Sequence, residues 1–261
     1  DRDWIKESGA DPEKVKTIIV DGSIYKIGDR VFEDLPALEN VFFNSDTYTI
    51  GEKAFADCEN LRNVVLPDKL TNLGFGSFNN DDSIEKIVVP GTLTKADFGW
   101  MYAADGVDVY YTGTQEQWDE VTSDLYDTTK KLKDIKVDAD AGSSGEKSYW
   151  VYDPKEKTLE VFGEDTIDKQ DEGKYPWSEH SSDTENIIVS GDFDKVPDNA
   201  FVDFKEAEHV KITGDVASVG KNSFAGTDKT NYIITKPSLK DIEDKSIGFD
   251  SDLAKKEDFT I

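Results

Sequence analysis

Residues 50–67 read IGEKAFADCENLRNVVLP, and this stretch decides the fold. Val64 and Leu66 alternate in a short apolar run, which predicts a β-strand with both side chains on one face. Gly51 marks a turn, and Phe55 returns an aromatic side chain to the interior from a short helical or 3₁₀ segment. A unit this small cannot bury its own apolar face, so it must stack on similar units to be stable.

The same pattern recurs every 23 residues on either side of this stretch. The recurring positions are Ile27, Ile50, Leu73 and Ala96; Phe32, Phe55 and Phe78; and Val41, Val64, Ile87 and Tyr110. Because several positions agree on one period, the sequence predicts a stack of about five units over residues 4–118. The expected fold class is an α/β repeat solenoid with short parallel strands and short helical or 3₁₀ turns.

A second array follows after a break in phase. Its recurring positions are Ile187, Val210 and Ile233, and Val196, Val219 and Ile242. Residues 139–147 are rich in Gly and Ser, a composition typical of a flexible linker. The sequence therefore predicts a first array in residues 1–138, a linker, and a second, shorter array in residues 148–261.

The unit at residues 50–67 resembles the BspA-type leucine-rich-repeat family, whose pattern reads I-G-x-x-A-F-x-x-C-x-x-L-x-x-I-x-I-P. The resemblance covers most of residues 4–118 and, more loosely, residues 173–250. It implies a bacterial cell-surface or secreted protein used in adhesion or in host and glycan contact, mostly without enzymatic activity. The sequence as given shows no signal peptide, so the extracellular location is an expectation from the resemblance alone.

Two further segments resemble parts of the proteins in this family. Residues 109–118 resemble the closing unit, and Thr114 with Gln117 forms a capping-box pattern that predicts a terminal helix over the end of the first array. Residues 149–150, 158–163 and 176–177 resemble the hairpin that leads into a second array. The resemblance thus places a lead-in hairpin at the start of residues 148–261.

Charge and hydropathy exclude several classes of partner. The chain has 30 Lys and Arg residues against 56 Asp and Glu residues, and its formal net charge is −26. Nucleic-acid binding needs a basic surface, and docking on an anionic membrane does too. No apolar run reaches the roughly 18 residues of a membrane-spanning helix. The sequence therefore predicts no nucleic-acid partner and no membrane insertion.

Candidate chemical groups are few. His180 and His209 have neither metal-ligand nor catalytic-triad spacing, and they are interpreted as a loop residue and a solvated strand residue. Cys58 lies between two core positions and is predicted to be a buried, inert thiol. Acidic pairs recur on one turn, at Glu33 and Asp34, Asp57 and Glu59, and Asp81 and Asp82. Stacked carboxylates attract Ca²⁺, but a solvated charged surface is the simpler interpretation, so we expect no cofactor. Because the histidines and Cys58 offer no catalytic arrangement, we also expect no catalysis.

The candidate binding site is a row of apolar residues expected on the outer face of the first array. Its members are Ile19, Phe42, Val65, Val88 and Tyr111, and their polar neighbours are Asn40, Asn63 and Lys86. Contiguous exposed apolar residues mark contact surfaces, which favours a protein or glycan partner here. Two alternatives stay open: such residues are good strand formers, and the other array packs on this face.

Three functions follow from these patterns. The first is a non-enzymatic surface or secreted binding and adhesion module that uses the strand face. The second is a carbohydrate-binding or carbohydrate-active module, with sugar-stacking surfaces at Trp100, Trp118, Trp150 and Trp177. The third is a structural spacer within a larger surface protein.

Overall fold

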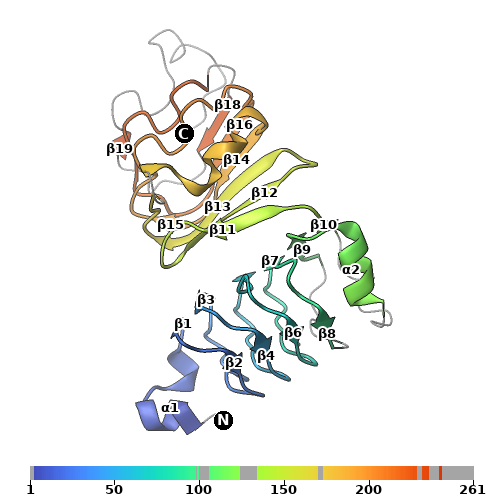
Figure 1. The fold of residues 1–261 in the computed structure, drawn as a ribbon. Helices are drawn as coiled ribbons and strands as arrows, with labels where there is room; N and C mark the ends of the chain where they lie inside the picture. Colours follow the sequence, from blue (N-terminus) through green and yellow to red (C-terminus); the bar gives the residue numbers. More distant parts are fainter. Residues whose placement is uncertain are drawn as a thin grey trace. The chain divides into compact units, whose positions relative to one another are not determined.

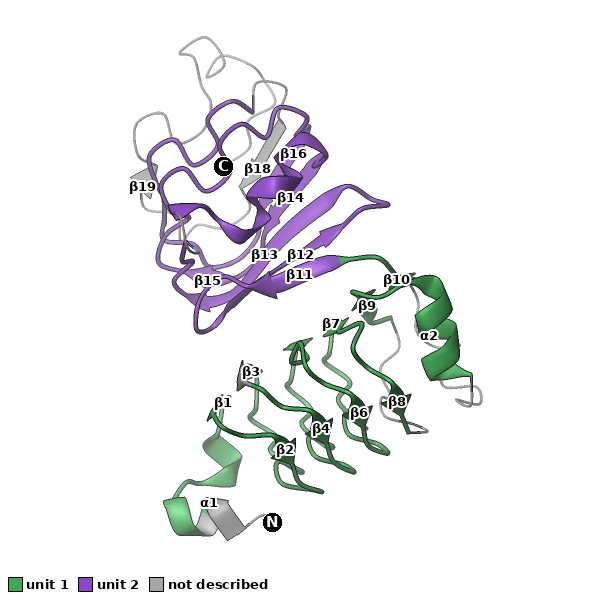
Figure 2. Ribbon diagram, in the orientation of Figure 1, with its two compact units in different colours: residues 1–139 green, residues 140–261 purple. Residues whose placement is uncertain are grey.

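The computed structural model of this 261-residue chain describes residues 3–97, 99, 106–123, 134–169, 173–227, 231–234 and 241–242. The chain divides into two compact units, residues 1–139 and residues 140–261 (Figure 2). Within each unit, short strands follow one another as the rungs of a solenoid (Figure 1). None of the helices in these described ranges is long and apolar enough to cross a membrane.

Parallel strands form two sheets in the first unit (Figure 1). The larger sheet has the order β1 (Thr17–Gly22), β3 (Asn40–Ser45), β5 (Asn63–Val65), β7 (Lys86–Val89), β9 (Asp108–Tyr111) and β10 (Asp134–Lys136). The smaller sheet has the order β2 (Lys26–Ile27), β4 (Thr49–Ile50), β6 (Asn72–Leu73) and β8 (Lys95–Ala96). The described helices of this unit are α1 (Asp3–Ser8), the 3₁₀ helix η1 (Pro12–Lys14) and α2 (Gln115–Thr122).

Strand pairing confirms the repeat and the expected solenoid of parallel strands. Val41 pairs with Val64, and Val64 pairs with Ile87. In the smaller sheet, Ile50 pairs with Leu73 at the same period. This second sheet was not expected from the sequence, because strands of two residues are too short to show an alternating pattern.

The segment around Phe55 differs from the prediction of a helical or 3₁₀ segment, because it consists of turns. The backbone N–H of Lys53 donates to the carbonyl of Phe75 at 2.9 Å, and that of Phe55 donates to the carbonyl of Ser77 at 2.9 Å. These partners lie one repeat further along the chain. These N–H groups therefore join neighbouring repeats instead of bonding within a helix.

A ladder of phenylalanine rings forms the centre of the first core. Phe55 stacks between Phe32 and Phe78, with ring centroids 5.0 and 5.3 Å apart. Phe55 and Phe78 are fully buried. Burial of one such side chain stabilises the fold by about 1.5–3 kcal/mol, and each ring needs its neighbours in order to be buried.

The last repeat of the first unit is one residue shorter than the others. Ile87 pairs with Val109, and Val88 pairs with Tyr110, so the predicted equivalence of Ile87 and Tyr110 is wrong. A shift of one residue exchanges the two faces of a strand. Val109 and Tyr111 consequently belong to the core, whereas Tyr110 takes the outward position.

The predicted capping box and terminal helix are present. Thr114 Oγ1 accepts a hydrogen bond from the Gln117 N–H, and Gln117 Oε1 accepts one from the Thr114 N–H at 2.8 Å. Trp118 of helix α2 is buried against Tyr111, with ring centroids 5.0 Å apart. The helix therefore contributes its tryptophan to the core at this end of the array.

The second unit begins with antiparallel strands and continues with parallel ones. Its larger sheet has the order β11 (Asp140–Ser143), β12 (Ser148–Asp153), β13 (Thr158–Asp165), β14 (Asn186–Val189), β16 (His209–Ile212) and β18 (Asn231–Ile234). Other described elements are the 3₁₀ helix η4 (Pro176–Ser182), β15 (Asp192–Phe193), β17 (Ser218–Val219) and β19 (Asp241–Ile242). β12 and β13 form a hairpin where the resemblance placed one.

The second array shows the same irregularity as the first. Ile187 pairs with Val210 at the expected spacing. Val210 then pairs with Tyr232, where the period predicts Ile233. The repeat between β16 and β18 is therefore also one residue shorter than the period.

The prediction of a flexible linker at residues 139–147 is wrong for its first half. Asp140–Ser143 forms strand β11, which is paired antiparallel with β12. Gly142 lies opposite Trp150, and a Cβ atom at Gly142 would lie 3.1 Å from Trp150 Nε1. The glycine leaves room for an aromatic ring that packs closely against the strand, so composition alone was misleading here.

Candidate functional site

The outward row of the first array is buried along most of its length. Phe42, Val65 and Val88 do not belong to the core cluster, but each is at most 8% exposed. Ile19 is 39% exposed, because β1 is the terminal strand of its sheet. Of the predicted row, Ile19 is thus exposed in this structure, whereas Phe42, Val65 and Val88 are buried.

The end of this row also differs from the prediction. Tyr111 is fully buried in the core because of the one-residue shift, and Tyr110 takes its place. Lys136 of β10 covers Tyr110: its Nζ lies 4.4 Å from the ring centroid and 3.0 Å from the hydroxyl. Neither tyrosine offers the exposed ring that the predicted site requires.

The predicted polar neighbours of the row are only partly available. Asn40 pairs with Asn63, and Asn63 pairs with Lys86, so the three do lie side by side across the sheet. Both asparagines are half-buried, and Lys86 is buried. Solvent access at these positions is smaller than a ligand-binding surface needs.

The outer face of the smaller sheet carries a groove of about 450 Å³. Its floor is formed by outward residues of consecutive strands, namely Lys26, Thr49, Asn72 and Lys95. Acidic groups lie at its border: Asp29 Oδ1 accepts a hydrogen bond from the Glu52 N–H, and Lys95 pairs with Asp97 at 3.0 Å. The groove thus presents charges of both signs together with hydroxyl and amide groups.

Exposed aromatic side chains accompany this groove. Phe75 lines it and is 43% exposed, while Tyr25 and Tyr48 are 58% and 40% exposed. The two tyrosines stack with ring centroids 6.1 Å apart, and each directly precedes a residue of the groove floor, Lys26 or Thr49. The sequence contained a signal for them, since Tyr25 and Tyr48 are 23 residues apart, but the strands that place them were not recognised.

Three of the four predicted tryptophans do not supply sugar-stacking surfaces. Trp118, Trp150 and Trp177 are buried, and Trp177 Nε1 donates to the carbonyl of Ala200 at 2.8 Å. Their rings belong to the cores of the two units. Trp100 lies outside the described residues.

Acidic side chains on the turns form hydrogen bonds between neighbouring repeats. Asp81 is fully buried, and its Oδ1 accepts a hydrogen bond from the Cys58 N–H at 2.7 Å. Asn80 donates to Asp57 Oδ1 at 2.7 Å across the same pair of repeats. Burial raises the pKa of the Cys58 thiol, and the charge of Asp81 raises it further, which agrees with the predicted inert thiol.

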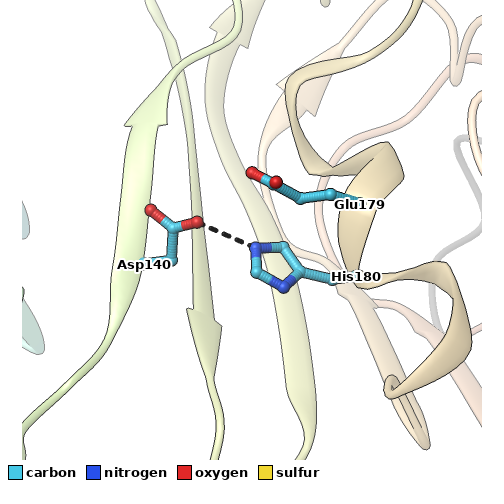
Figure 3. Close-up of side chains that lie close together, drawn as sticks. All are labelled: Asp140, Glu179 and His180. Atoms are coloured by element: carbon cyan, nitrogen blue, oxygen red, sulfur yellow. Dashed lines mark hydrogen bonds and ion pairs between the residues drawn. The ribbon is translucent and has the colours of Figure 1, made fainter.

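A second cluster lies within the second unit, where Asp140 of β11 meets Glu179 and His180 of η4 (Figure 3). One ligand atom from each of the three residues lies within 4.8 Å of the other two. His180 Nε2 is 2.9 Å from Asp140 Oδ2. The interpretation of His180 as a loop residue is wrong, because it lies in the 3₁₀ helix η4. No local pattern in the sequence reveals this cluster, because 40 residues separate Asp140 from His180.

Comparisons with known proteins agree with the repeat. The profile of the BspA-type leucine-rich-repeat region matches residues 10–104 and 174–253 in six copies. A search of curated proteins finds no match.

Several solved structures are similar to the chain. A leucine-rich cell surface protein from Faecalibacterium prausnitzii is 13% identical, with 90% of this chain and 79% of that chain covered and a TM-score of 0.26. A leucine-rich-repeat protein from Eubacterium ventriosum is 16% identical, with 94% and 72% covered and a TM-score of 0.32. The pneumococcal vaccine antigen PcpA is 13% identical, with 95% and 72% covered and a TM-score of 0.34. Because the family profile matches more than half of the residues of this chain, the chain belongs to the BspA-type leucine-rich-repeat family.

Proposed function

We propose that this protein is a non-enzymatic binding module of the bacterial cell surface, and that its first unit contacts the partner through the outer face of the smaller sheet. Family membership supports the surface location and the absence of catalysis. The contact face differs from the one expected from the sequence, since most of that row is buried.

One observation carries the proposal: Phe75 lines a polar groove on the smaller sheet, and the exposed Tyr25 and Tyr48 directly precede two residues of that groove. Tyr25, Tyr48 and Phe75 retain 40–58% of their surface. Aromatic side chains are enriched among the residues that dominate binding energy, because they offer large apolar area at little entropic cost. The adjoining groove adds hydrogen-bond donors and acceptors that orient a partner.

A carbohydrate partner is the second candidate, and the lining of the groove favours it. Carboxylates, an amide and a hydroxyl lie within one groove that Phe75 also lines. Sugars need such hydrogen-bonding groups for their hydroxyls and an aromatic ring for their apolar face. This candidate replaces the buried tryptophans with exposed aromatic residues as the stacking surface.

The experiment screens the full chain on glycan and host-protein arrays and then measures the affinity of each confirmed ligand. We expect the double variant Tyr25→Ser/Tyr48→Ser to weaken binding by tenfold or more, since truncated aromatic contacts commonly cost over 1.4 kcal/mol. Ile19→Ser is the matched control, because Ile19 is equally exposed but lies on the larger sheet.

The outcomes separate the alternatives. Loss of binding in Ile19→Ser, with normal binding in the tyrosine variant, would return the site to the strand face of the larger sheet. Binding to glycans alone would select the carbohydrate candidate. A chain that binds nothing on either array would instead support the role of a structural spacer.

A further inference from the structure

We propose that Asp140, Glu179 and His180 form a Zn²⁺ site in the second unit. The three side chains reach into one space from two elements, β11 and η4 (Figure 3). Ligand atoms around tetrahedral Zn²⁺, with bonds of about 2.0–2.2 Å, lie roughly 3.3–3.6 Å apart. The observed ligand atoms all lie within 4.8 Å of one another, so rotations of the side chains suffice to close the site.

The donor set selects the metal. One imidazole nitrogen and two carboxylate oxygens suit Zn²⁺, which accepts both kinds of ligand. Ca²⁺ and Mg²⁺ prefer sites made of oxygen atoms alone, so an imidazole makes this a poor site for them. Three protein ligands leave one position for water or for a donor from a partner.

His180 is held in place before any metal binds. Its ring stacks on Tyr152, with centroids 4.1 Å apart and an angle of 19° between the planes. Tyr152 is also the strand partner of Asp140, so one residue positions both ligands. The carbonyl of His180 accepts hydrogen bonds from the Thr184 hydroxyl at 2.8 Å and the Thr184 N–H at 3.1 Å. A fixed ligand loses little entropy on metal binding.

The local charge favours a cation. Two carboxylates, Asp140 and Glu179, approach one imidazole, and within the described ranges no Lys or Arg forms an ion pair with either of them. Like charges at this separation repel each other, and a divalent cation would remove the repulsion. The side chain of His180 is only 14% exposed. Because little water surrounds it, the attraction between its side of the site and a cation is less screened.

The test titrates ZnCl₂ into the full chain, free of any affinity tag and stripped of metal, by isothermal calorimetry. We expect one equivalent to bind and the melting temperature to rise, because a ligand that binds only the folded state stabilises it. Millimolar Ca²⁺ or Mg²⁺ is not expected to displace the bound Zn²⁺. EDTA is expected to reverse both effects.

Variants locate the site. His180→Ala is expected to lose Zn²⁺ binding by about 100-fold or more, and Glu179→Gln by about tenfold or more. Glu179 is exposed, so its variant keeps the fold and stays informative if His180→Ala is unstable. His209→Ala is the matched control, since it removes the other histidine, which is exposed on β16, and should bind like the wild type.

Two results would overturn the proposal. The first is that the wild type takes up no Zn²⁺, which would mean that the His180–Asp140 contact is only an ion pair. Alternatively, Glu179→Gln and His180→Ala bind Zn²⁺ as tightly as the wild type, which would place the metal elsewhere on this acidic chain.

Discussion

At the residue scale, the repeat depends on how closely neighbouring turns approach each other. A Cβ atom at Gly74 would lie 2.6 Å from the Glu52 nitrogen and 2.6 Å from the Gly51 carbon. Backbone atoms cannot move away as a flexible side chain can. Glycine therefore recurs at this position because the preceding repeat already fills the space that a side chain needs.

Left-handed backbone explains why Asp or Asn recurs at one position of the turns. Asp34, Asp57 and Asn80 follow one another at the repeat period, with φ angles of 59°, 62° and 62°. Asp and Asn tolerate this conformation better than most residues, because their short polar side chains bond to the local backbone. The Asp or Asn that recurs at this one position of the turn thus has a conformational cause.

Asp81 provides a prediction about pH. Burial raises the pKa of its carboxyl to about 9, against the hydrogen bond from the Cys58 N–H, which lowers it. An unfolded Asp titrates near pH 3.9, so between about pH 4 and 9 the folded state binds more protons than the unfolded state. Stability then falls as pH rises through this window, by up to about 1.4 kcal/mol per unit. We expect Asp81→Asn, which keeps an oxygen acceptor, to flatten this decline.

Urea unfolding at pH 5, 7 and 8.5 measures the effect. Asp82→Asn is the matched control, because Asp82 is adjacent but exposed. The prediction is contradicted when the two variants and the wild type lose stability with pH at the same rate.

At the element scale, a single residue in the last repeat decides which side chains line the core. The shortened repeat before β9 turns Tyr111 inward, and helix α2 supplies Trp118 to pack on it. The cap and the shift are therefore coupled: without the inward Tyr111, the tryptophan would have no ring to contact. An end repeat of a solenoid needs such a cover because no further unit buries its face.

The cap provides the second prediction. Trp118→Ala should destabilise the first unit by about 3–5 kcal/mol, because it removes a buried aromatic ring. Thr114→Ala should cost about 1 kcal/mol, since it removes only the N-cap hydrogen bond. Hydrogen exchange at the amides of β9 and α2 measures both losses and assigns them to this end of the array.

Glu116→Ala is the control for the cap, because Glu116 lies exposed in the same helix and should change stability by less than about 0.5 kcal/mol. Exchange at β9 that is unaffected by Trp118→Ala would show that α2 does not stabilise the array.

At the scale of the whole molecule, charge dominates. A net charge of −26 on 261 residues repels itself, and the repulsion is strongest in the compact state. Many of the basic side chains in the described part of the chain form exposed ion pairs, such as Lys69 with Asp46 at 2.8 Å. Exposed ion pairs contribute little to folding stability. The stability that salt adds by screening the net repulsion is therefore expected to exceed the stability that it removes by weakening these pairs.

The third prediction follows from this balance. Raising NaCl from 10 to 150 mM shortens the screening length from about 30 to 8 Å and should raise the melting temperature by several degrees. Sucrose at matched osmolality controls for effects unrelated to ionic screening. A melting temperature that falls with added salt would mean that the ion pairs outweigh the net repulsion.

The sequence by itself determined the solenoid, its period, the phenylalanine ladder around Phe55 and the cap at Thr114 and Gln117. These features depend on interactions within a repeat or between adjacent repeats, and such interactions leave a regular spacing in the chain. The two-residue strands of the smaller sheet were missed because they are too short for any alternation.

Only the tertiary structure decided which surfaces remain exposed and which distant residues meet. Phe42 and Val88 have the pattern of outward strand residues, yet they are buried, while Tyr25 stays exposed. Asp140 meets His180 across 40 residues of chain because strand pairing and helix η4 bring them together. The physical reason is that the exposure of a side chain, and the meeting of two distant residues, depend on contacts between segments far apart in the sequence. The local spacing of residues does not reveal those contacts.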